Sequence, residues 1–370
     1  MILAVSIVGG FRREILQKVI GFNSHITLYP QESGSGVIKF TPELDSIISG
    51  TPGVTSHSLS ATVPALLKSP GAFRGIYLRG ISGNADTTFL HSAITEGRMP
   101  RQKSSELLIS ASVARHLGLS VGDSINLFMI AEGITARRLP VSGIYNSHFE
   151  NYDDYLVFAP IELPQALASL SPDEGTTVEI YTSSLSETER LTPELAERLN
   201  NGILSGRLNQ VYRMDTALDK GANYLAWLDM LDTNVWIILT LMTLVAVFTL
   251  ISGLLIIILQ KVRFIGVMKA IGASSGRLRH IFVLMAVRIA VTGLLAGNAI
   301  AIAVIAVQSA WHVIPLNPEA YYIDFVPVSM SLPLLLALNA AFILIIYLML
   351  IIPARFVSRI SPAESMRFEH

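Results

Sequence analysis

The chain has 370 residues, 27 Lys and Arg against 28 Asp and Glu, and a formal net charge of −1. It has no basic stripe with interleaved aromatics, so we expect no nucleic-acid partner. Hydrophobic residues make up 51% of the chain and the mean hydropathy is +0.52, which excludes an ordinary soluble protein. The absence of cysteine excludes disulfides, thiolate metal sites and a cysteine nucleophile.

The amino end, residues 1–21, is apolar but too short to cross a membrane by itself. It also lacks the basic start and the cleavage site of a signal peptide. Residues 22–233 must still be delivered to the outer side of the membrane, because the span at 235–259 that follows them leads into the cytoplasm. We therefore expect residues 1–21 to be the end and exit of a first transmembrane helix whose upstream half is absent, through a shifted start or a trimmed chain.

Residues 22–214 alternate short strand and helix patterns, which predicts an α+β extracytoplasmic domain. Thr41 is placed to cap a helix, and Gly118 to close another. The segments SINLFMI and RLPVSGIY predict a hairpin with Arg137 and Arg138 at its exposed tip. Two strand–helix–strand units flanking a β-rich insert predict two subdomains.

Hydrophobicity and charge divide the rest of the chain. The 25 residues of 235–259 carry no charge, enough for a helix to cross a hydrocarbon core of about 30 Å. Residues 260–280 carry five Lys and Arg and no acid, which is typical of a cytoplasmic loop. The predicted segments are a connector helix at 215–234, spans at 235–259, 281–308 and 332–354, an outer loop at 309–331 and a cytoplasmic tail at 355–370.

Within the cytoplasmic loop, residues 262–270 predict a short amphipathic helix that Gly272 ends, because glycine adopts positive φ easily. Its apolar residues are Ile265 and Met268, and its polar residues are Arg263 and Lys269. Such a helix could lie on lipid headgroups or dock into a soluble partner, and the residues alone leave both open.

The chain contains none of the sequence motifs that mark nucleotide-binding, metalloprotease or serine-hydrolase sites. No G-x-x-x-x-G-K-[ST] loop, H-E-x-x-H or G-x-S-x-G sequence occurs, so we expect no catalytic residue here. The acidic residues Glu150, Asp153 and Asp154 lack EF-hand spacing and are expected to form a solvated loop rather than a metal site. No cofactor is therefore expected in this chain.

Two sets of membrane residues allow more than one interpretation. Gly293 and Gly297 form a G-x-x-x-G motif, which favours helix packing. Large apolar residues on the outer half of the 235–259 span could line an acyl-chain cavity or face bulk lipid. These residues are Val235, Trp236, Leu239 and Met242.

Several segments resemble one family. VSIVGGFRREILQKVIGFNSHITL is similar to the first-span exit, and QKVRFIGVMKAIGASSGRLRHIF to the cytoplasmic coupling segment, of FtsX/MacB-type permeases of ABC transporters. EAYYIDFVPVSM resembles the outer loop before the last span, and PARFVSRISPAESMRFE the closing tail. LGLSVGDSINL matches a strand turn of the external domains. Within this family the chain most resembles the LolC/LolE lipoprotein-releasing permeases.

The resemblance implies a four-span permease of the inner membrane with its large domain in the periplasm. A separate ATPase subunit would bind ATP and Mg²⁺, and a second permease, identical or paralogous, would complete the membrane part. A lipoprotein would leave the outer leaflet by mechanotransmission and pass to a periplasmic LolA-like carrier. The implied ATPase-coupling residues are Arg263, Ile265, Gly266, Met268, Lys269, Gly272 and Ala273, and the implied carrier-binding residues are Arg137 and Arg138.

Two other functions fit the same architecture. A MacB-like exporter permease would work with a periplasmic adaptor, but the outer loop favours the lipoprotein function. An FtsX-like regulator would activate a cell-wall hydrolase without transport, although its external domain is typically much smaller than the one predicted here. The client and the carrier-contact residues are not readable from the sequence.

Overall fold

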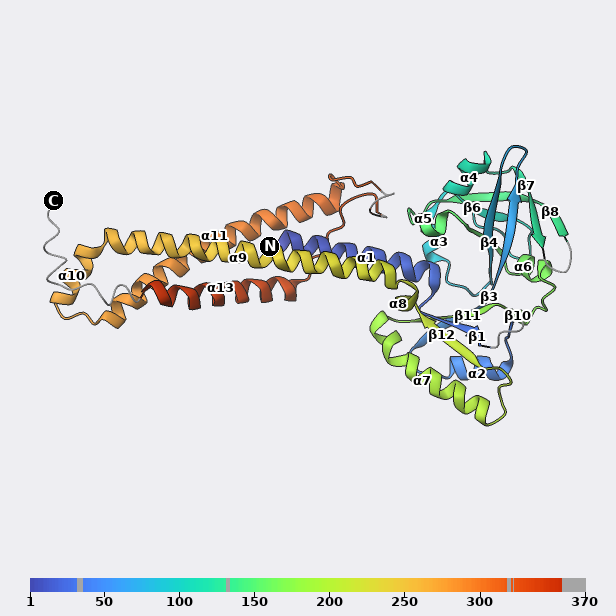
Figure 1. Ribbon diagram of the computed structural model, residues 1–370, viewed down its shortest axis with the longest axis horizontal. Coiled ribbons are helices and arrows are strands. Elements are labelled where there is room, and N and C mark those ends of the chain that lie inside the picture. Colours follow the sequence, from blue (N-terminus) through green and yellow to red (C-terminus); the bar gives the residue numbers. More distant parts are fainter. Residues whose placement is uncertain (32–35, 131–133, 318–320, 322, 355–370) are drawn as a thin grey trace. The chain divides into compact units, whose positions relative to one another are not determined.

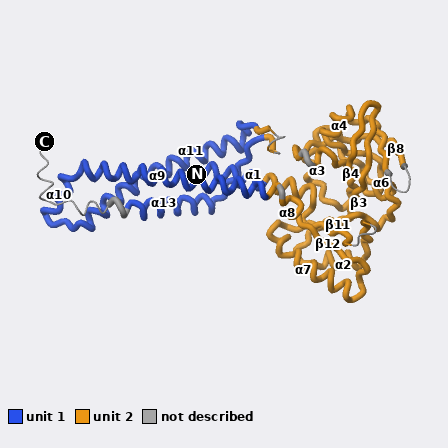
Figure 2. The backbone as a smooth tube through the Cα atoms, viewed as in Figure 1, with its two compact units in different colours: residues 1–13, 226–315, 325–370 blue, residues 14–225, 316–324 orange. Residues whose placement is uncertain are grey.

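The computed structural model describes residues 1–31, 36–130, 134–317, 321 and 323–354 (Figure 1). The chain divides into two compact units (Figure 2). The helical unit consists of residues 1–13, 226–315 and 325–370, and the sheet unit of residues 14–225 and 316–324.

The described helices are α1 (Ile2–Asn23), α2 (Pro42–Ser49), α3 (Thr88–Ala93), α4 (Ala111–Leu117), α5 (Glu150–Asp153), α6 (Glu162–Leu167), α7 (Leu185–Leu204), α8 (Ala217–Lys220), α9 (Ala222–Gln260), α10 (Val262–Ala270), α11 (Ser275–Trp311) and α13 (Leu332–Ala354). The described strands are β1 (Ile26–Pro30), β2 (Ile38–Lys39), β3 (Val54–Lys68), β4 (Phe73–Ile81), β5 (Ile94–Gly97), β6 (Leu107–Ser110), β7 (Ser124–Ile130), β8 (Ile134–Tyr145), β9 (Leu156–Pro160), β10 (Glu174–Gly175), β11 (Thr177–Thr182) and β12 (Tyr212–Thr216).

Among the described residues, the helical unit has three helices long and apolar enough to cross a membrane. They are α9, α11 and α13. A core at one end of the unit joins them to α10, and its fully buried members include Ile258, Ile265 and Leu278. The predicted three apolar spans are therefore present as helices.

Six strands of the sheet unit pair in a closed ring. β3 pairs with β4, β4 with β9, β9 with β6, β6 with β8, β8 with β7, and β7 again with β3. Successive side chains of a strand point to opposite faces. The apolar ones form a core with α4 and α6, in which Leu67, Leu127 and Val157 are fully buried.

The long strand β3 also belongs to a second core. Its first half pairs with β11, and its second half with β4. β1 lies between β11 and β12 and is antiparallel to both, so β11, α7 and β12 form a strand–helix–strand unit (Figure 1). Helices α2 and α7 pack on these strands and bury Leu28, Leu44 and Leu195.

Local chain signals place the helix ends. The Thr41 hydroxyl accepts a hydrogen bond from Leu44 N at 3.3 Å and caps α2, as its position predicts. Gly118 has φ 66° after α4, and Gly272 has φ 98° after α10. Both are in the left-handed region that favours glycine, so both predicted helix ends are confirmed.

The predicted connector helix at 215–234 begins later than expected. Asp215 pairs with Thr27 in the β1–β12 ladder, so it is a strand residue. The Thr216 hydroxyl then accepts a hydrogen bond from Asp219 N, and the Asp219 carboxylate accepts one from Thr216 N. This capping box starts the short helix α8, and α9 begins after Gly221.

Candidate functional site

The turn between α9 and α11 is built from two helix ends and a short helix. α9 ends at Gln260, α10 follows, and the chain turns at Gly272 before α11. The Ser274 hydroxyl accepts a hydrogen bond from Arg277 N at 3.4 Å and caps α11. The sequence therefore fixes a helix–turn–helix–turn–helix segment at the place predicted for coupling.

The predicted coupling residues divide between two sides of α10. Ile265 is fully buried in the core of the helical unit, and Gly266 is buried beside it. Met268 and Ala273 pack partly against the same core, whereas Arg263 is exposed. Ile265 and Gly266 therefore hold α10 to the transmembrane helices, and their contacts lie within this chain.

An exposed apolar set on α10 was missed by the sequence analysis. Phe264 and Val267 are about half exposed, and Ile271, just beyond the end of the helix, is 77% exposed. Their spacing of three and four residues places them on one side of the segment. That i, i+3, i+7 spacing is visible in the sequence, but every position of α10 except Arg263 and Lys269 is apolar or glycine, which hides the pattern.

The membrane residues predicted for an acyl-chain cavity differ in exposure. Leu239 is only 3% exposed, whereas Trp236 and Met242 are mostly exposed and Val235 is partly buried. A cavity of about 590 Å³ lies elsewhere in the helical unit. It is lined by residues of α1, α9, α11 and α13, and the four predicted residues are not among them.

The G-x-x-x-G motif of α11 lines this cavity. A Cβ atom built on Gly293 or Gly297 would meet no described atom within 4 Å outside its own helix. No helix in the described part of the chain packs against these glycines, so the predicted helix packing at this motif stays a prediction for a partner chain. The neighbouring residue Asn298 donates instead to Asn339 Oδ1 of α13 at 3.1 Å.

Arg137 and Arg138 lie in the β7–β8 hairpin, but not at its tip. Both are strand residues of β8, opposite Leu127 and Asn126, and both are exposed. The predicted tip position is wrong because the strand begins at Ile134, before both arginines; residues 131–133 lie outside the described part of the chain.

Comparisons with known proteins identify the family. A model described as the MacB-like periplasmic core domain matches residues 1–198, and one described as the FtsX-like permease C-terminal matches residues 236–362. The chain belongs to the FtsX/MacB-type permeases of ABC transporters. This family contains permease subunits, which are not themselves the catalytic part of the transporter.

Curated relatives extend the similarity along the whole permease. The chain is 23% identical to the lipoprotein-releasing system transmembrane protein LolC of Xylella fastidiosa, covering 100% of this chain and 90% of that protein. It is 22% identical to LolE of Haemophilus influenzae, covering 98% and 90%. The solved periplasmic region of MacB from Actinobacillus actinomycetemcomitans is 11% identical, with a TM-score of 0.38 over 57% of this chain and 97% of that one.

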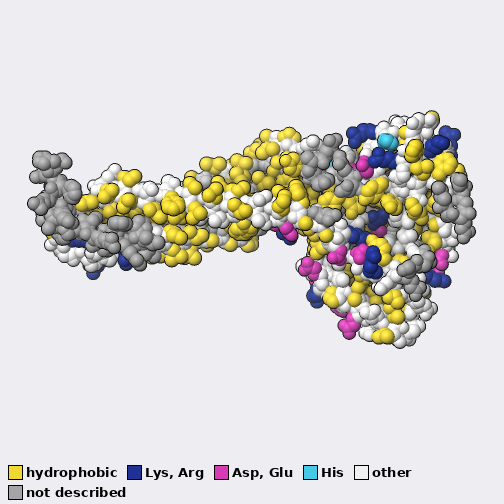
Figure 3. Space-filling model, viewed as in Figure 1, with side chains coloured by type: hydrophobic (Ala, Val, Ile, Leu, Met, Phe, Trp, Pro, Cys, Tyr) yellow, Lys and Arg dark blue, Asp and Glu magenta, His cyan; other side chains and the backbone are white. Residues whose placement is uncertain are grey.

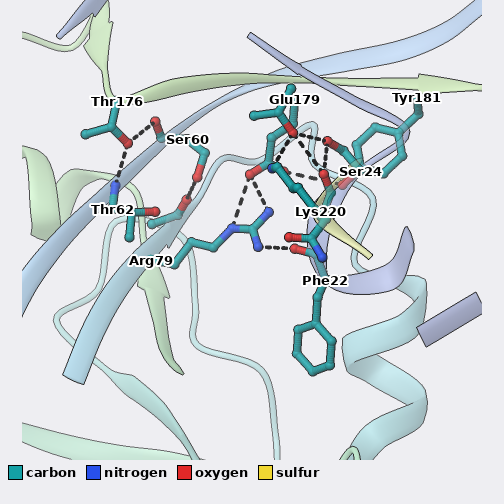
Figure 4. Close-up of polar contacts among 12 residues, drawn as sticks. Phe22, Ser24, Ser60, Thr62, Arg79, Thr176, Glu179, Tyr181 and Lys220 are labelled. Atoms are coloured by element: carbon teal, nitrogen blue, oxygen red, sulfur yellow. Dashed lines mark hydrogen bonds and ion pairs between the residues drawn. The ribbon is translucent and has the colours of Figure 1, made fainter. Parts of the chain in front are cut away.

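The permease also contains a buried ion pair that the sequence analysis did not find. The Arg79 guanidinium of β4 donates from Nε to Glu179 Oε1 of β11 at 3.1 Å and also contacts the Phe22 carbonyl (Figure 4). The side chains are only 17% and 7% exposed. Burial alone would lower the pKa of Arg79, but the Glu179 carboxylate outweighs this effect and raises it. The Arg79 guanidinium therefore stays charged inside the sheet unit.

The predicted acidic cluster divides between separate partners. Asp153 is buried and its carboxylate accepts hydrogen bonds from Ser147 N and Oγ at 3.1 and 2.7 Å, so the expected solvated loop is wrong for this residue. Asp154 pairs with Arg74 at 3.1 Å. Within the described part of the permease, no group of His, Asp and Glu residues could hold a metal ion.

Proposed function

We propose that this permease extracts lipidated proteins from the outer leaflet of the inner membrane and passes them to a periplasmic carrier. The observation that supports this most is the match along almost the full length to relatives named as lipoprotein-releasing transmembrane proteins. A separate ATPase would bind ATP and Mg²⁺, and a second permease, identical or paralogous, would complete the complex.

The geometry of α10 supports a role in transmitting force. Phe264, Val267 and Ile271 present an apolar strip at i, i+3 and i+7, the spacing with which a helix occupies a groove on a partner. On the other side, Ile265 packs in a core shared with α9, α11 and α13. A displacement of α10 by the ATPase would therefore be carried directly to the three transmembrane helices.

The chemistry of the client supports mechanical extraction. Moving an acyl chain from lipid into water is opposed by about 0.8 kcal/mol for each CH₂ group, so extraction requires an energy source and a receiving pocket. α9, α11 and α13 present apolar surfaces, and an acyl chain that lies against them stays out of water at no cost in free energy. Arg137 and Arg138, exposed on the β7–β8 hairpin, are the proposed contacts for the carrier.

The finer architecture is part of this proposal. Residues 1–13 of α1 belong to the helical unit, which supports a fourth span beside α9, α11 and α13. The two apolar cores of the sheet unit support its division into two subdomains. Basic residues in the α9–α11 segment and the acidic balance of the sheet unit support a periplasmic sheet unit and a cytoplasmic α10.

Release of a labelled triacylated lipoprotein from proteoliposomes tests the function. The proteoliposomes contain the permease and its co-encoded ATPase, and release should require both ATP and a soluble carrier. Ile271→Asp should reduce ATP-dependent release at least tenfold by placing a charge in the apolar strip. Ile271→Leu, the matched control, should release the lipoprotein at close to the wild-type rate.

The same experiment separates the second candidate function. The match of the MacB-like periplasmic core model to residues 1–198 favours an exporter that works with a periplasmic adaptor. ATP hydrolysis without lipoprotein release, with or without the carrier, would contradict the extraction function. It would transfer the assignment to an exporter or to a regulator of a cell-wall hydrolase.

A further inference from the structure

The strands around Arg79 divide their side chains between two faces of the sheet. In β1, Ile26 and Leu28 enter the apolar core, whereas Thr27 and Tyr29 point to the opposite face. Thr27 is paired with Glu179 across the β1–β11 ladder, so both belong to this second face. Both are buried. A polar sheet face shielded from water is unusual, because buried polar groups are costly without partners.

A cavity of about 470 Å³ lies over this polar face. Its size is within the range of pockets that bind small molecules. Four tyrosines from different elements line it: Tyr29, Tyr77, Tyr152 and Tyr155. The rings of Tyr77 and Tyr155 meet edge to face, with centroids 5.7 Å apart, and both side chains are partly exposed. The cavity therefore offers aromatic surface that a ligand can reach.

Three cations line the cavity, and two of them have a carboxylate partner. Arg79 pairs with Glu179, and Arg213 pairs with Asp215 at 3.0 Å. Lys220 is the third cation, and in the described part of the chain no carboxylate forms an ion pair with it.

The contacts of Lys220 are with neutral groups. Its ammonium donates to Thr27 Oγ1 at 2.7 Å and lies 5.1 Å from the centre of the Tyr29 ring. Figure 4 shows Lys220 on the same side of the sheet as Arg79 and Glu179. An ammonium has three donors, so this group can still donate to a ligand.

The electrostatics of Lys220 agree with these contacts. Burial, followed by the charge of Arg79, lowers the pKa of Lys220 to about 8, and Arg213 acts in the same direction. Glu179 and Asp215 oppose this shift without cancelling it. The ammonium is therefore held in a site that disfavours its charge, and an added anion would compensate it.

We propose that this cavity binds a small organic anion, with a phosphate or carboxylate group paired to Lys220 and an apolar or ring portion packed on the tyrosines. Lysine binds phosphate as a compact point charge, and tyrosine rings bury an adjoining ring or chain. The anion is either a soluble molecule or the headgroup of a lipid, since both present the same chemistry. This site is independent of the proposed lipoprotein release.

Chemical labelling of the full-length permease in detergent tests the site. A brief exposure to acetic anhydride at pH 8, followed by mass spectrometry, reports how accessible Lys220 is. Phenyl phosphate should slow the acetylation of Lys220 at least fivefold, whereas benzyl alcohol at the same concentration should not. Lys68, an exposed lysine at the end of β3 outside the cavity, is the control and should be acetylated equally in both.

Variants separate the two parts of the proposed ligand site. Lys220→Met should weaken the binding of phenyl phosphate at least tenfold, as measured by calorimetry. Lys220→Arg should keep the affinity within about threefold of the wild type. Lys68→Met, the control, should leave the affinity unchanged. Tyr77→Ala keeps Lys220 in place and should weaken phenyl phosphate at least threefold without changing the binding of inorganic phosphate. Equal binding of phenyl phosphate and inorganic phosphate would overturn the organic part of the proposal.

Reconstituted vesicles distinguish the two sources of the anion. If phosphatidylglycerol vesicles protect Lys220 and phosphatidylcholine vesicles do not, while phenyl phosphate protects poorly, the ligand is a lipid headgroup. Protection by phenyl phosphate in detergent assigns a soluble anion. Protection by neither, with Lys220→Met and wild type binding alike, would overturn the site while leaving lipoprotein release untouched.

Discussion

The two units of the permease expose opposite kinds of side chain. In the sheet unit, apolar residues fill two cores and charged side chains are scattered over the surface, whereas the surface of the helical unit is mostly hydrophobic (Figure 3). Exposed apolar side chains of the helical unit include Phe248 and Ile300. Both arrangements remove apolar surface from water, in one case into the protein and in the other into lipid. Exposure is therefore informative only when the surrounding medium is known.

The two units also differ in the kind of polar contact that they contain: a charged pair in the sheet unit and a neutral amide pair in the helical unit. The sheet unit buries the Arg79–Glu179 ion pair, whose two charges cannot be separated without leaving one of them unpaired. The helical unit places the neutral pair Asn298–Asn339 between α11 and α13. A hydrogen bond between amides in lipid is worth less, because each amide finds other partners when the helices separate. The comparison predicts large effects of polar substitutions in the sheet unit and small ones in the helical unit.

Arg79→Met should give the largest effect. It leaves the Glu179 carboxylate buried without its partner, so we expect a loss of about 3–5 kcal/mol in the free energy of local unfolding. Hydrogen exchange of the β4 and β11 amides measures this loss. Arg190→Met is the matched control, since the Arg190 side chain is 66% exposed and its pair with Glu187 should contribute less than about 1 kcal/mol. Similar losses in the two variants would contradict the comparison.

The pH dependence of stability should reveal Lys220. The pKa of Lys220 is about 8 in the folded chain, against an ordinary value of 10.5. Below pH 8 the lysine is therefore protonated in both the folded and the unfolded chain. Between pH 8 and 10.5 the unfolded chain binds more protons, so stability rises with pH by up to about 3 kcal/mol. The stability difference between wild type and Lys220→Met, followed from pH 7 to 11, measures this rise. A difference that does not change with pH would show that Lys220 is ordinarily hydrated.

Gly272→Ala should destabilise the turn between α10 and α11 moderately. A methyl group would meet no described atom within 4 Å, so the effect comes only from the positive φ of 98°, at about 1–2 kcal/mol. Gly276 is equally open but lies in α11 without positive φ, so Gly276→Ala should stabilise by up to about 1 kcal/mol. Thermal unfolding of the purified permease in detergent compares the two. If Gly272→Ala and Gly276→Ala changed the stability in the same direction, a positive φ at Gly272 would be excluded.

The amide pair of the helical unit should give the smallest effect. A double-mutant cycle with Asn298→Ala and Asn339→Ala should yield a coupling free energy of about 0.6 kcal/mol, and not more than about 1.7 kcal/mol. Unfolding in mixed detergent micelles measures the four stabilities. A coupling as large as the loss in Arg79→Met would remove the distinction between the two units.

The sequence predicted features that depend on neighbouring residues. Three apolar spans follow from uninterrupted hydrophobic runs, because the length of a helix needed to cross lipid is fixed. The Thr41 cap and the positive φ of Gly118 and Gly272 follow from the chemistry of one residue and its immediate chain. Such features need no tertiary contact to be correct, and the structure confirms them.

Features that depend on distant residues were missed or misplaced. The tip position expected for Arg137 and Arg138 was wrong, because the length of β8 is set by its pairing with β7. The glycines of α11 line a cavity because the path of the neighbouring helices, rather than the motif, decides what lies against them.

The sequence by itself determined the three apolar spans, the cap of α2, the glycine turns after α4 and α10, and the family to which the chain belongs. Tertiary structure decided which side of α10 is anchored and which is free, since almost every residue of that helix is apolar or glycine. It also decided that Arg79 and Glu179 of the sheet and Lys220 of α8 line one cavity. Arg79 and Glu179 lie 100 positions apart and are brought together by pairing between strands, which sequence distance does not determine. Lys220 belongs to α8, which begins directly after β12 at the capping box of Thr216 and Asp219.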